Sequence, residues 1–192
     1  MGMELEWKFR ADADRQAAVL AAFGPWHSIQ METTYYDTPG RALSARHITL
    51  RRRLENGVSI CTVKTPAGNG ARGEWECQCG NIEESIDILC KLGASTEISL
   101  LAASGLEPVC GAAFMRQACH VSVEGALVEI AVDKGKLFGG GSELPLCEIE
   151  VELKDGAPDA AQQFAAALAA KYDLQPEAKS KFRRALSLAE GE

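Results

Sequence analysis

The sequence predicts an α+β fold in which eight antiparallel strands close into a barrel with a charged interior, surrounded by peripheral helices. Three observations support this prediction. Eight segments alternate polar and apolar residues with the two-residue period of a strand. On most of these segments the polar face is charged rather than merely polar. Between them lie amphipathic and alanine-rich segments with the period of a helix.

The predicted strands are short and are separated by turn residues. In the first, Glu4, Glu6 and Lys8 fall on one face, and Leu5 and Trp7 fall on the other. Asn-Gly at positions 56 and 57 predicts a hairpin between the third and fourth strands. The eight segments are 3–10, 30–38, 48–54, 58–64, 72–78, 114–123, 126–133 and 146–154.

Helices are expected over 12–23, 82–92, 158–172 and 176–188, with a further turn at 98–101. Gly24 and Pro25 end the first of them, and Gly93 ends the second. The chain shows no internal repeat and no low-complexity linker. We therefore expect residues 1–192 to form one domain.

Composition excludes several classes of protein. Hydrophobic residues make up 46% of the 192 residues, which is enough for a core. The net charge of −7 argues against nucleic-acid binding, and no apolar run approaches the roughly 18 residues of a membrane span. The first residues lack the apolar core of a secretory signal. The seven cysteines contain no CxxC pair and the three histidines lack zinc-site spacing, so we expect reduced thiols in a cytoplasmic protein without a zinc centre.

The charged strand faces point to metal and phosphate chemistry. Acids pair with acids two residues apart, as at Glu148 and Glu150, where strand geometry places them about 6–7 Å from each other. Such carboxylates repel unless a cation lies between them, and Mg²⁺ and Mn²⁺ prefer oxygen ligands. Arg51 and Arg53, also two apart, suit phosphate oxygens. An ordinary antiparallel sheet with one solvated face is the alternative interpretation of any single strand. Together, the strands predict a polyphosphate held inside the barrel, with the apolar faces turned outward under the helices.

At these residues the sequence resembles the CYTH superfamily, also called the triphosphate tunnel metalloenzymes. The segment from Glu4 to Lys8 matches the ExExK pattern of that family. The remaining matches follow in order along nearly the whole chain. They are Tyr35-Tyr36-Asp37-Thr38-Pro39, Leu50-Arg51-Arg52-Arg53, Thr62-Val63-Lys64, Arg72 with Glu74-Trp75-Glu76, Arg116, the run from Val128 to Asp133, the run from Glu148 to Glu152, and Ser180-Lys181 with Arg184.

The resemblance implies roles for individual residues. It implies divalent metal, Mg²⁺ or Mn²⁺, on Glu4, Glu6, Glu148 and Glu150, with Asp133 as an additional ligand and Glu152 as a weaker candidate nearer the strand end. It implies triphosphate binding by Lys8, Arg51, Arg53, Arg72, Arg116, Lys181 and Arg184. Lys64 would lie near the attacked phosphorus and orient water, with Lys8 as its catalytic companion. For Arg184 a solvated helical face is an equal alternative.

Several reactions occur in families of this kind. We expect hydrolysis of inorganic triphosphate to pyrophosphate and phosphate, because the layout from Glu4 to Arg184 resembles that of the bacterial inorganic triphosphatases and no additional segment suggests an adenine pocket or an RNA-binding surface. The alternatives are a class IV adenylate cyclase, a thiamine-triphosphatase and a non-catalytic polyphosphate-binding module. The expected partner is a small-molecule triphosphate, with neither nucleic acid nor membrane, and the sequence leaves a homodimer open.

Overall fold

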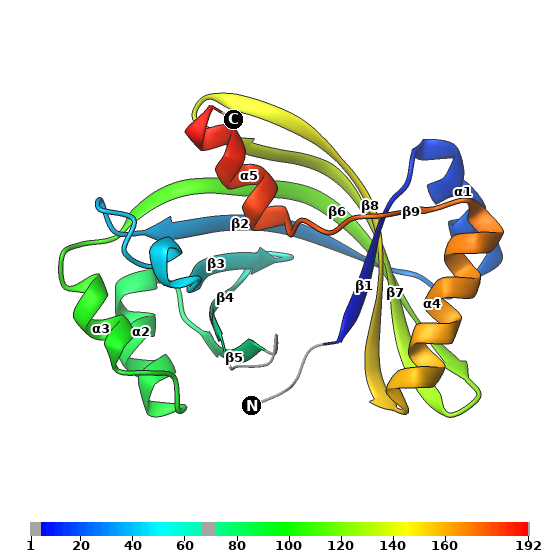
Figure 1. The fold of residues 1–192 in the computed structure, drawn as a ribbon, viewed down its shortest axis with the longest axis horizontal. Coiled ribbons are helices and arrows are strands. Elements are labelled where there is room, and N and C mark those ends of the chain that lie inside the picture. The colour runs from blue at the N-terminus through cyan, green and yellow to red at the C-terminus, as the bar shows by residue number, and fades with distance from the viewer. Residues whose placement is uncertain (1–4, 67–71, 192) are drawn as a thin grey trace.

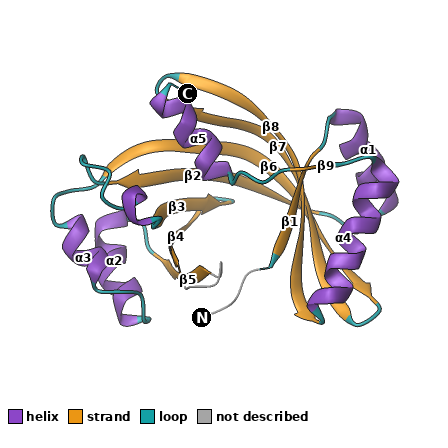
Figure 2. Cartoon of the chain, in the orientation of Figure 1, coloured by secondary structure: helices purple, strands orange, loops and turns teal. Residues whose placement is uncertain are grey.

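The protein is built around one antiparallel sheet. In the computed structural model, which describes residues 5–66 and 72–191, the strands pair in the order β5-β4-β3-β2-β6-β7-β8-β1-β9 (Figures 1 and 2). The strands are β1 (Glu6–Arg10), β2 (His27–Asp37), β3 (Thr49–Glu55), β4 (Val58–Pro66), β5 (Arg72–Gln78), β6 (Glu107–Val123), β7 (Ala126–Gly139), β8 (Ser142–Gly156) and β9 (Gln175–Pro176). The helices are α1 (Ala13–Ala22), α2 (Ile82–Lys91), α3 (Glu97–Ala102), α4 (Pro158–Tyr172) and α5 (Lys181–Glu190), with a 3₁₀ turn over Ser44–Arg46.

The curvature of the sheet gives the molecule its tunnel-like shape. Figure 1 shows the sheet curling so that β1 and β5, which are far apart in the strand order, face each other across the inner side of the curve. The predicted α+β fold with an antiparallel tunnel and peripheral helices is confirmed. Among the described residues, the sheet does not close: the strand order ends at β5 on one side and at β9 on the other. The sequence did not predict β9, which contains two residues.

The strands β6, β7 and β8 are much longer than the sequence predicts. β6, β7 and β8 contain 17, 14 and 15 residues, because they continue through glycines and prolines that normally mark turns. At Gly135 on β7, an added Cβ would lie 2.2 Å from the carbonyl oxygen of Ala113 on β6. Glycine here permits close approach of two long, curved strands rather than ending one of them.

The prediction that the last helix begins at residue 176 is wrong. Gln175 and Pro176 instead pair with Arg10 and Phe9 on the edge of β1. The helix begins at Lys181, after Ser180, whose hydroxyl accepts a hydrogen bond from the backbone N–H of Arg183. The turn expected at 98–101 is a short helix, α3.

Helices cover both faces of the sheet. We call the face that carries Asp133 and Glu148 the inner face, and the opposite one the outer face. On the outer face, α1 and α4 pack on one half of the sheet around Val128 and Ile149, and α2 and α3 pack on β3 and β4. None of the helices among the described residues is long and apolar enough to cross a membrane.

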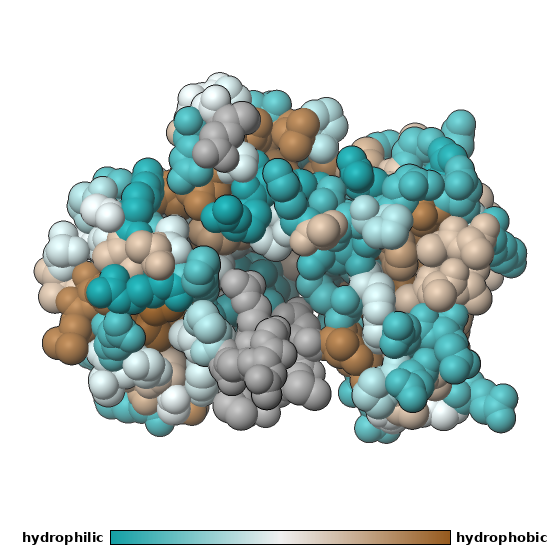
Figure 3. Space-filling model, in the orientation of Figure 1, coloured by the Kyte–Doolittle hydropathy of each residue, from teal (hydrophilic) through white to brown (hydrophobic). Residues whose placement is uncertain are grey.

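The inner face is not charged along its whole length. Leu137 on β7 and Leu146 on β8 share the inner face with the acids, and they pack with Leu186 of α5. An added Cβ at Gly139 would lie 2.5 Å from the carbonyl oxygen of Ala185, so glycine lets α5 approach the strand closely. One end of the inner face is therefore apolar and covered by α5, an arrangement that the sequence did not predict. In Figure 3 hydrophobic residues form separate patches among hydrophilic ones on the side drawn.

Candidate functional site

Three acidic side chains meet on the inner face. Asp133 on β7 lies opposite Glu148 on β8, and Glu150 follows two residues later on the same face. Asp133 and Glu148 are fully buried, and Glu150 is 9% exposed. One carboxylate oxygen from each residue lies within 4.8 Å of the other two. Sheet register, not sequence proximity, brings the aspartate to the glutamates.

Three cations surround these acids. Arg116 on β6 donates to Asp133 through Nε at 2.8 Å and through a terminal nitrogen at 2.7 Å, and it also bonds Glu150. The Nζ of Lys181 lies 2.9 Å from Asp133 and 2.7 Å from Glu150 and donates to Glu148 as well. Arg184 donates to the second oxygen of Glu148. The first turn of α5 thus supplies two of the three cations.

Burial and ion pairing act in opposite directions on the acids. Burial raises the pKa of Glu148 to about 7, and the adjacent Glu150 carboxylate acts in the same direction against Lys181 and Arg184. Burial also opposes the charge of Glu150, but Lys181 and Arg116 hold its pKa well below its usual range. The pKa of Lys181 is raised by Glu150, Asp133 and Glu148 although burial opposes its charge. Both shifts favour the charged forms, the carboxylate of Glu150 and the ammonium of Lys181.

This donor set fits a hard divalent cation. Three carboxylates converge there, and Mg²⁺ and Mn²⁺ bind through carboxylate oxygens together with phosphates and waters. The same oxygens are ion-paired to Lys181, Arg116 and Arg184, so an incoming metal ion has to displace some of these contacts.

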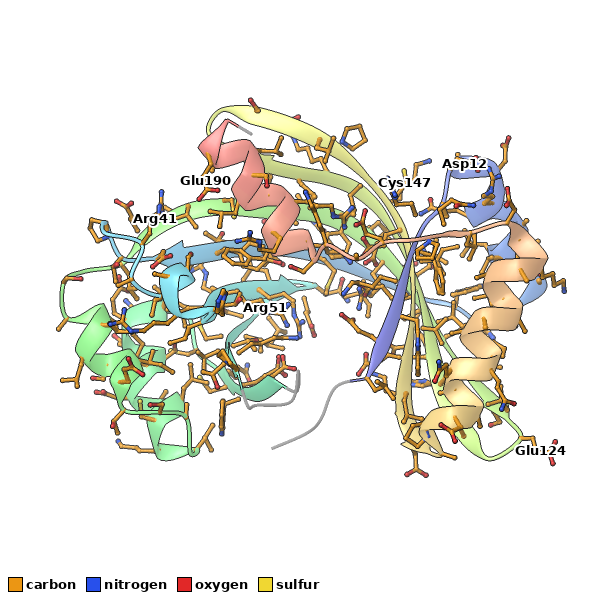
Figure 4. The ribbon with its side chains drawn as sticks, viewed as in Figure 1. Asp12, Arg41, Arg51, Glu124, Cys147 and Glu190 are labelled. Atoms are coloured by element: carbon orange, nitrogen blue, oxygen red, sulfur yellow. The ribbon has the colours of Figure 1, made fainter. Side chains whose placement is uncertain are left out.

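A second group of charged side chains lies on β3, β4 and β5. We call this group the second charged wall, and the three acids with their cations the first. Arg51 is 3.6 Å from Glu74, and Lys64 lies 3.2 Å from the same carboxylate. Arg53 is 2.7 Å from Glu55 and 3.6 Å from Glu76. Figure 4 shows many side chains, Arg51 among them, in the space between β3 and β1.

The two walls are close enough to influence each other. Burial lowers the pKa of Arg53, and the positive charges of Arg51 and Arg116 contribute in the same direction. Tyr35 on β2 is buried, which raises its pKa, while Arg51 and Lys181 oppose that shift. The ring centres of Tyr35 and Phe182 lie 4.9 Å apart. Tyr35 therefore connects the second charged wall to the first turn of α5.

The remaining predicted residues are placed as follows. Lys8 lies opposite Glu150 in the β1–β8 ladder, and its Nζ is 2.9 Å from Glu6. Glu6 lies opposite Glu152, one step along the sheet from the three buried acids, and is not part of that cluster. Glu4 lies outside the described residues, as does the side chain of Arg72, whose backbone begins β5. The roles of all these residues stay predictions.

Two acidic residues outside the predicted site hold segments of the chain in place, one beside the site and one in the loop after β2. Glu177 lies 3.8 Å from Arg184 and 3.5 Å from Arg10, so it joins α5 to β1. Nothing in the sequence around Glu177 signals this contact. Asp37 is 1% exposed and accepts backbone hydrogen bonds from Thr38, Leu43 and Ser44. This aspartate of the Tyr-Tyr-Asp-Thr-Pro segment folds the loop after β2 and makes no contact with the three acids.

Comparison with known proteins identifies the family. The model of the CYTH domain matches residues 2–186. The chain is a member of the CYTH family. An inorganic triphosphatase from Haemophilus influenzae is 30% identical over 153 residues, which are 79% of this chain and 44% of that protein. This CYTH chain therefore spans less than half the length of that relative.

Solved structures share the CYTH fold along nearly the whole chain. The PH1819 protein of Pyrococcus horikoshii has a TM-score of 0.66 and 22% identity, with 98% of this chain and 99% of that one covered. A putative adenylate cyclase from Bacillus halodurans has a TM-score of 0.62 at 16% identity, with 96% and 98% covered. A putative adenylyl cyclase from Hippeastrum, described as having a dominant triphosphatase activity, also has a TM-score of 0.62 at 16% identity, with 100% and 97% covered. At these identities the likeness concerns the fold alone.

Proposed function

We propose that this protein hydrolyses inorganic triphosphate to pyrophosphate and phosphate in a reaction that depends on Mg²⁺ or Mn²⁺. The observation that carries the proposal is the cluster of Asp133, Glu148 and Glu150, buried on the same face of the sheet as Arg51 and Arg53 of β3. The inorganic triphosphatase of Haemophilus influenzae, 30% identical, supports the choice of substrate. A polyphosphate needs both halves of such a site, because metal and guanidinium groups together neutralise its oxygens.

The chain's own residues would divide the work between binding and orientation. Asp133, Glu148 and Glu150 would hold the metal, which when bound would neutralise phosphate oxygens as charge builds on the leaving group. Arg51, Arg53 and Arg116 would hold the phosphate chain in line, with Lys8 and Lys181 beside the acids. Lys64, held by Glu74, would face the terminal phosphorus and orient the attacking water. The water oxygen bonds to that phosphorus, the bridging P–O bond breaks, pyrophosphate leaves with its electron pair, and the water's proton passes to solvent.

Phosphate release measured on the purified chain tests this proposal. With Mg²⁺ or Mn²⁺ we expect release of phosphate from inorganic triphosphate, none in EDTA, and no cyclic AMP from ATP. Thiamine triphosphate serves as a competing substrate. Cyclic AMP from ATP, a strong preference for thiamine triphosphate, or tight triphosphate binding without turnover would each contradict the proposal.

A matched pair of variants on β8 shows whether the buried acids carry the activity. Glu150→Gln keeps the shape of the side chain but removes a buried charge, and we expect kcat/KM to fall by about 10²- to 10³-fold. Glu143→Gln changes an exposed acid of the same strand, which pairs with Lys136, and should leave kcat/KM unchanged. Equal rates in the two variants would show that the cluster is not the site of reaction.

A further inference from the structure

A buried amide lies directly behind the acidic cluster. Gln16 of α1 is 3% exposed, on the outer face of the sheet, and its Nε2 donates to the backbone carbonyl oxygens of Asp133 at 2.8 Å and Glu148 at 3.3 Å. The carboxylates of the same two residues lie on the inner face. The Gln16 amide therefore contacts the backbones of β7 and β8 at the residue pair, Asp133 and Glu148, that carries two of the acids.

The chemistry of Gln16 matches this position. An amide nitrogen has two N–H donors, one for each carbonyl. The neighbours on this face are apolar, and the next buried residue of α1 is Val19. Burying a polar amide among them is unfavourable unless its hydrogen bonds are made. If packing were the only requirement at this position, an apolar side chain would meet it.

The helix that carries Gln16 is fixed at its start. The Asp12 side chain caps α1 by accepting from the backbone N–H of Arg15 at 2.9 Å. The Arg15 side chain in turn donates to the backbone carbonyl of Asp173 at 3.0 Å, just after α4, and pairs with the Asp173 carboxylate. Figure 1 shows α1 beside α4, away from α2 and α3. The position of the amide is thus set by contacts independent of the acids.

We propose that Gln16 is a positioning residue that fixes the backbones of Asp133 and Glu148 relative to each other and so sets the spacing of their carboxylates for a divalent cation. The inference rests on the proposed function, because it assigns metal binding to these acids. Residues that orient metal ligands without touching the metal typically change metal affinity or activity about 10- to 100-fold when replaced. Gln16 would act from the opposite face of the sheet.

Two substitutions at position 16 test this inference. Gln16→Met keeps a side chain of similar length without donors, and Gln16→Glu keeps the shape but presents oxygen to both carbonyls. The control is Val19→Ala, which loosens the same helix on the same core without touching either carbonyl. Each protein is titrated with Mn²⁺ without substrate, well below its thermal midpoint, and kcat and KM for inorganic triphosphate are measured over a range of Mg²⁺ concentrations.

We expect both position-16 variants to bind Mn²⁺ about 10- to 100-fold more weakly and to need correspondingly more Mg²⁺ for half-maximal turnover. Val19→Ala should lower only the thermal midpoint. If either folded position-16 variant matches wild type, or changes no more than Val19→Ala, the inference is overturned. A wild-type protein that binds Mn²⁺ but releases no phosphate would overturn the proposed function alone, and the titration would still decide the role of Gln16. A wild type that binds no Mn²⁺ would overturn the role of Gln16, and one that in addition releases no phosphate would overturn both.

Discussion

Replacing Arg116 with methionine is expected to lower the free energy of unfolding by about 3–5 kcal/mol, because it removes one of the two buried cations that Asp133 and Glu150 share. Arg116 makes two hydrogen bonds to Asp133, whose side chain has no exposed surface, and a third to Glu150. Methionine has a similar volume, so the loss reports charge rather than packing. Denaturant unfolding measured by circular dichroism gives the difference directly.

The control for this experiment is an exposed ion pair. Arg46 donates to Glu97 at 2.9 Å, with about half of each side chain exposed. Because solvent screens such pairs, Arg46→Met should cost about 0–1 kcal/mol. Similar losses in Arg116→Met and Arg46→Met would mean that the buried acids do not depend on Arg116 for their stability.

Replacing Lys181 with methionine is expected to make stability depend on a divalent cation. The ammonium group of Lys181 contacts Asp133, Glu148 and Glu150 together, and among the residues that the structure describes Arg116 and Arg184 remain as their cations without it. Loss of this buried partner should cost about 3–5 kcal/mol without metal. The vacated position is bordered by three carboxylates, which favours Mg²⁺ or Mn²⁺.

Thermal unfolding with increasing Mn²⁺ measures the effect. A ligand that binds only the native state adds about 2.7 kcal/mol of stability at 100 times its Kd. We expect Mn²⁺ to raise the midpoint of Lys181→Met more than that of wild type, in which the ammonium competes. Lys136→Met, on β7 but half-exposed and paired with exposed Glu143, is the control. An equal Mn²⁺ response in wild type and Lys181→Met would show that metal does not bind where Lys181 lies.

Local patterns in the sequence predict most of the fold. The bounds of β5 and α4 agree with prediction. Strict alternation of polar and apolar residues defines β5, and a proline at the first position defines the start of α4. The paired acids of β8 are also apparent from alternation alone, since one strand face must carry both Glu148 and Glu150. Residues that share one face of a single strand are thus predictable from their spacing.

Contacts between distant segments could not be predicted in the same way. Register places Asp133 opposite Glu148, and curvature of the long strands lets α5 bring Lys181 to both. The Ser-Lys context predicts a role for Lys181, but not its contact with all three acids. Gln16 carries no sequence signal, because a glutamine in an alanine-rich helix looks like a solvated residue. Only packing of α1 on the outer face shows that its amide is buried behind the site.

The most direct test of metal-dependent triphosphate hydrolysis is ³¹P NMR of inorganic triphosphate incubated with the wild-type protein, first in EDTA and then with Mg²⁺. The arrangement of acids and cations predicts no change in EDTA and, after Mg²⁺ is added, equal amounts of pyrophosphate and phosphate. A triphosphate signal that persists unchanged in Mg²⁺ and in Mn²⁺, with the protein folded, would contradict it.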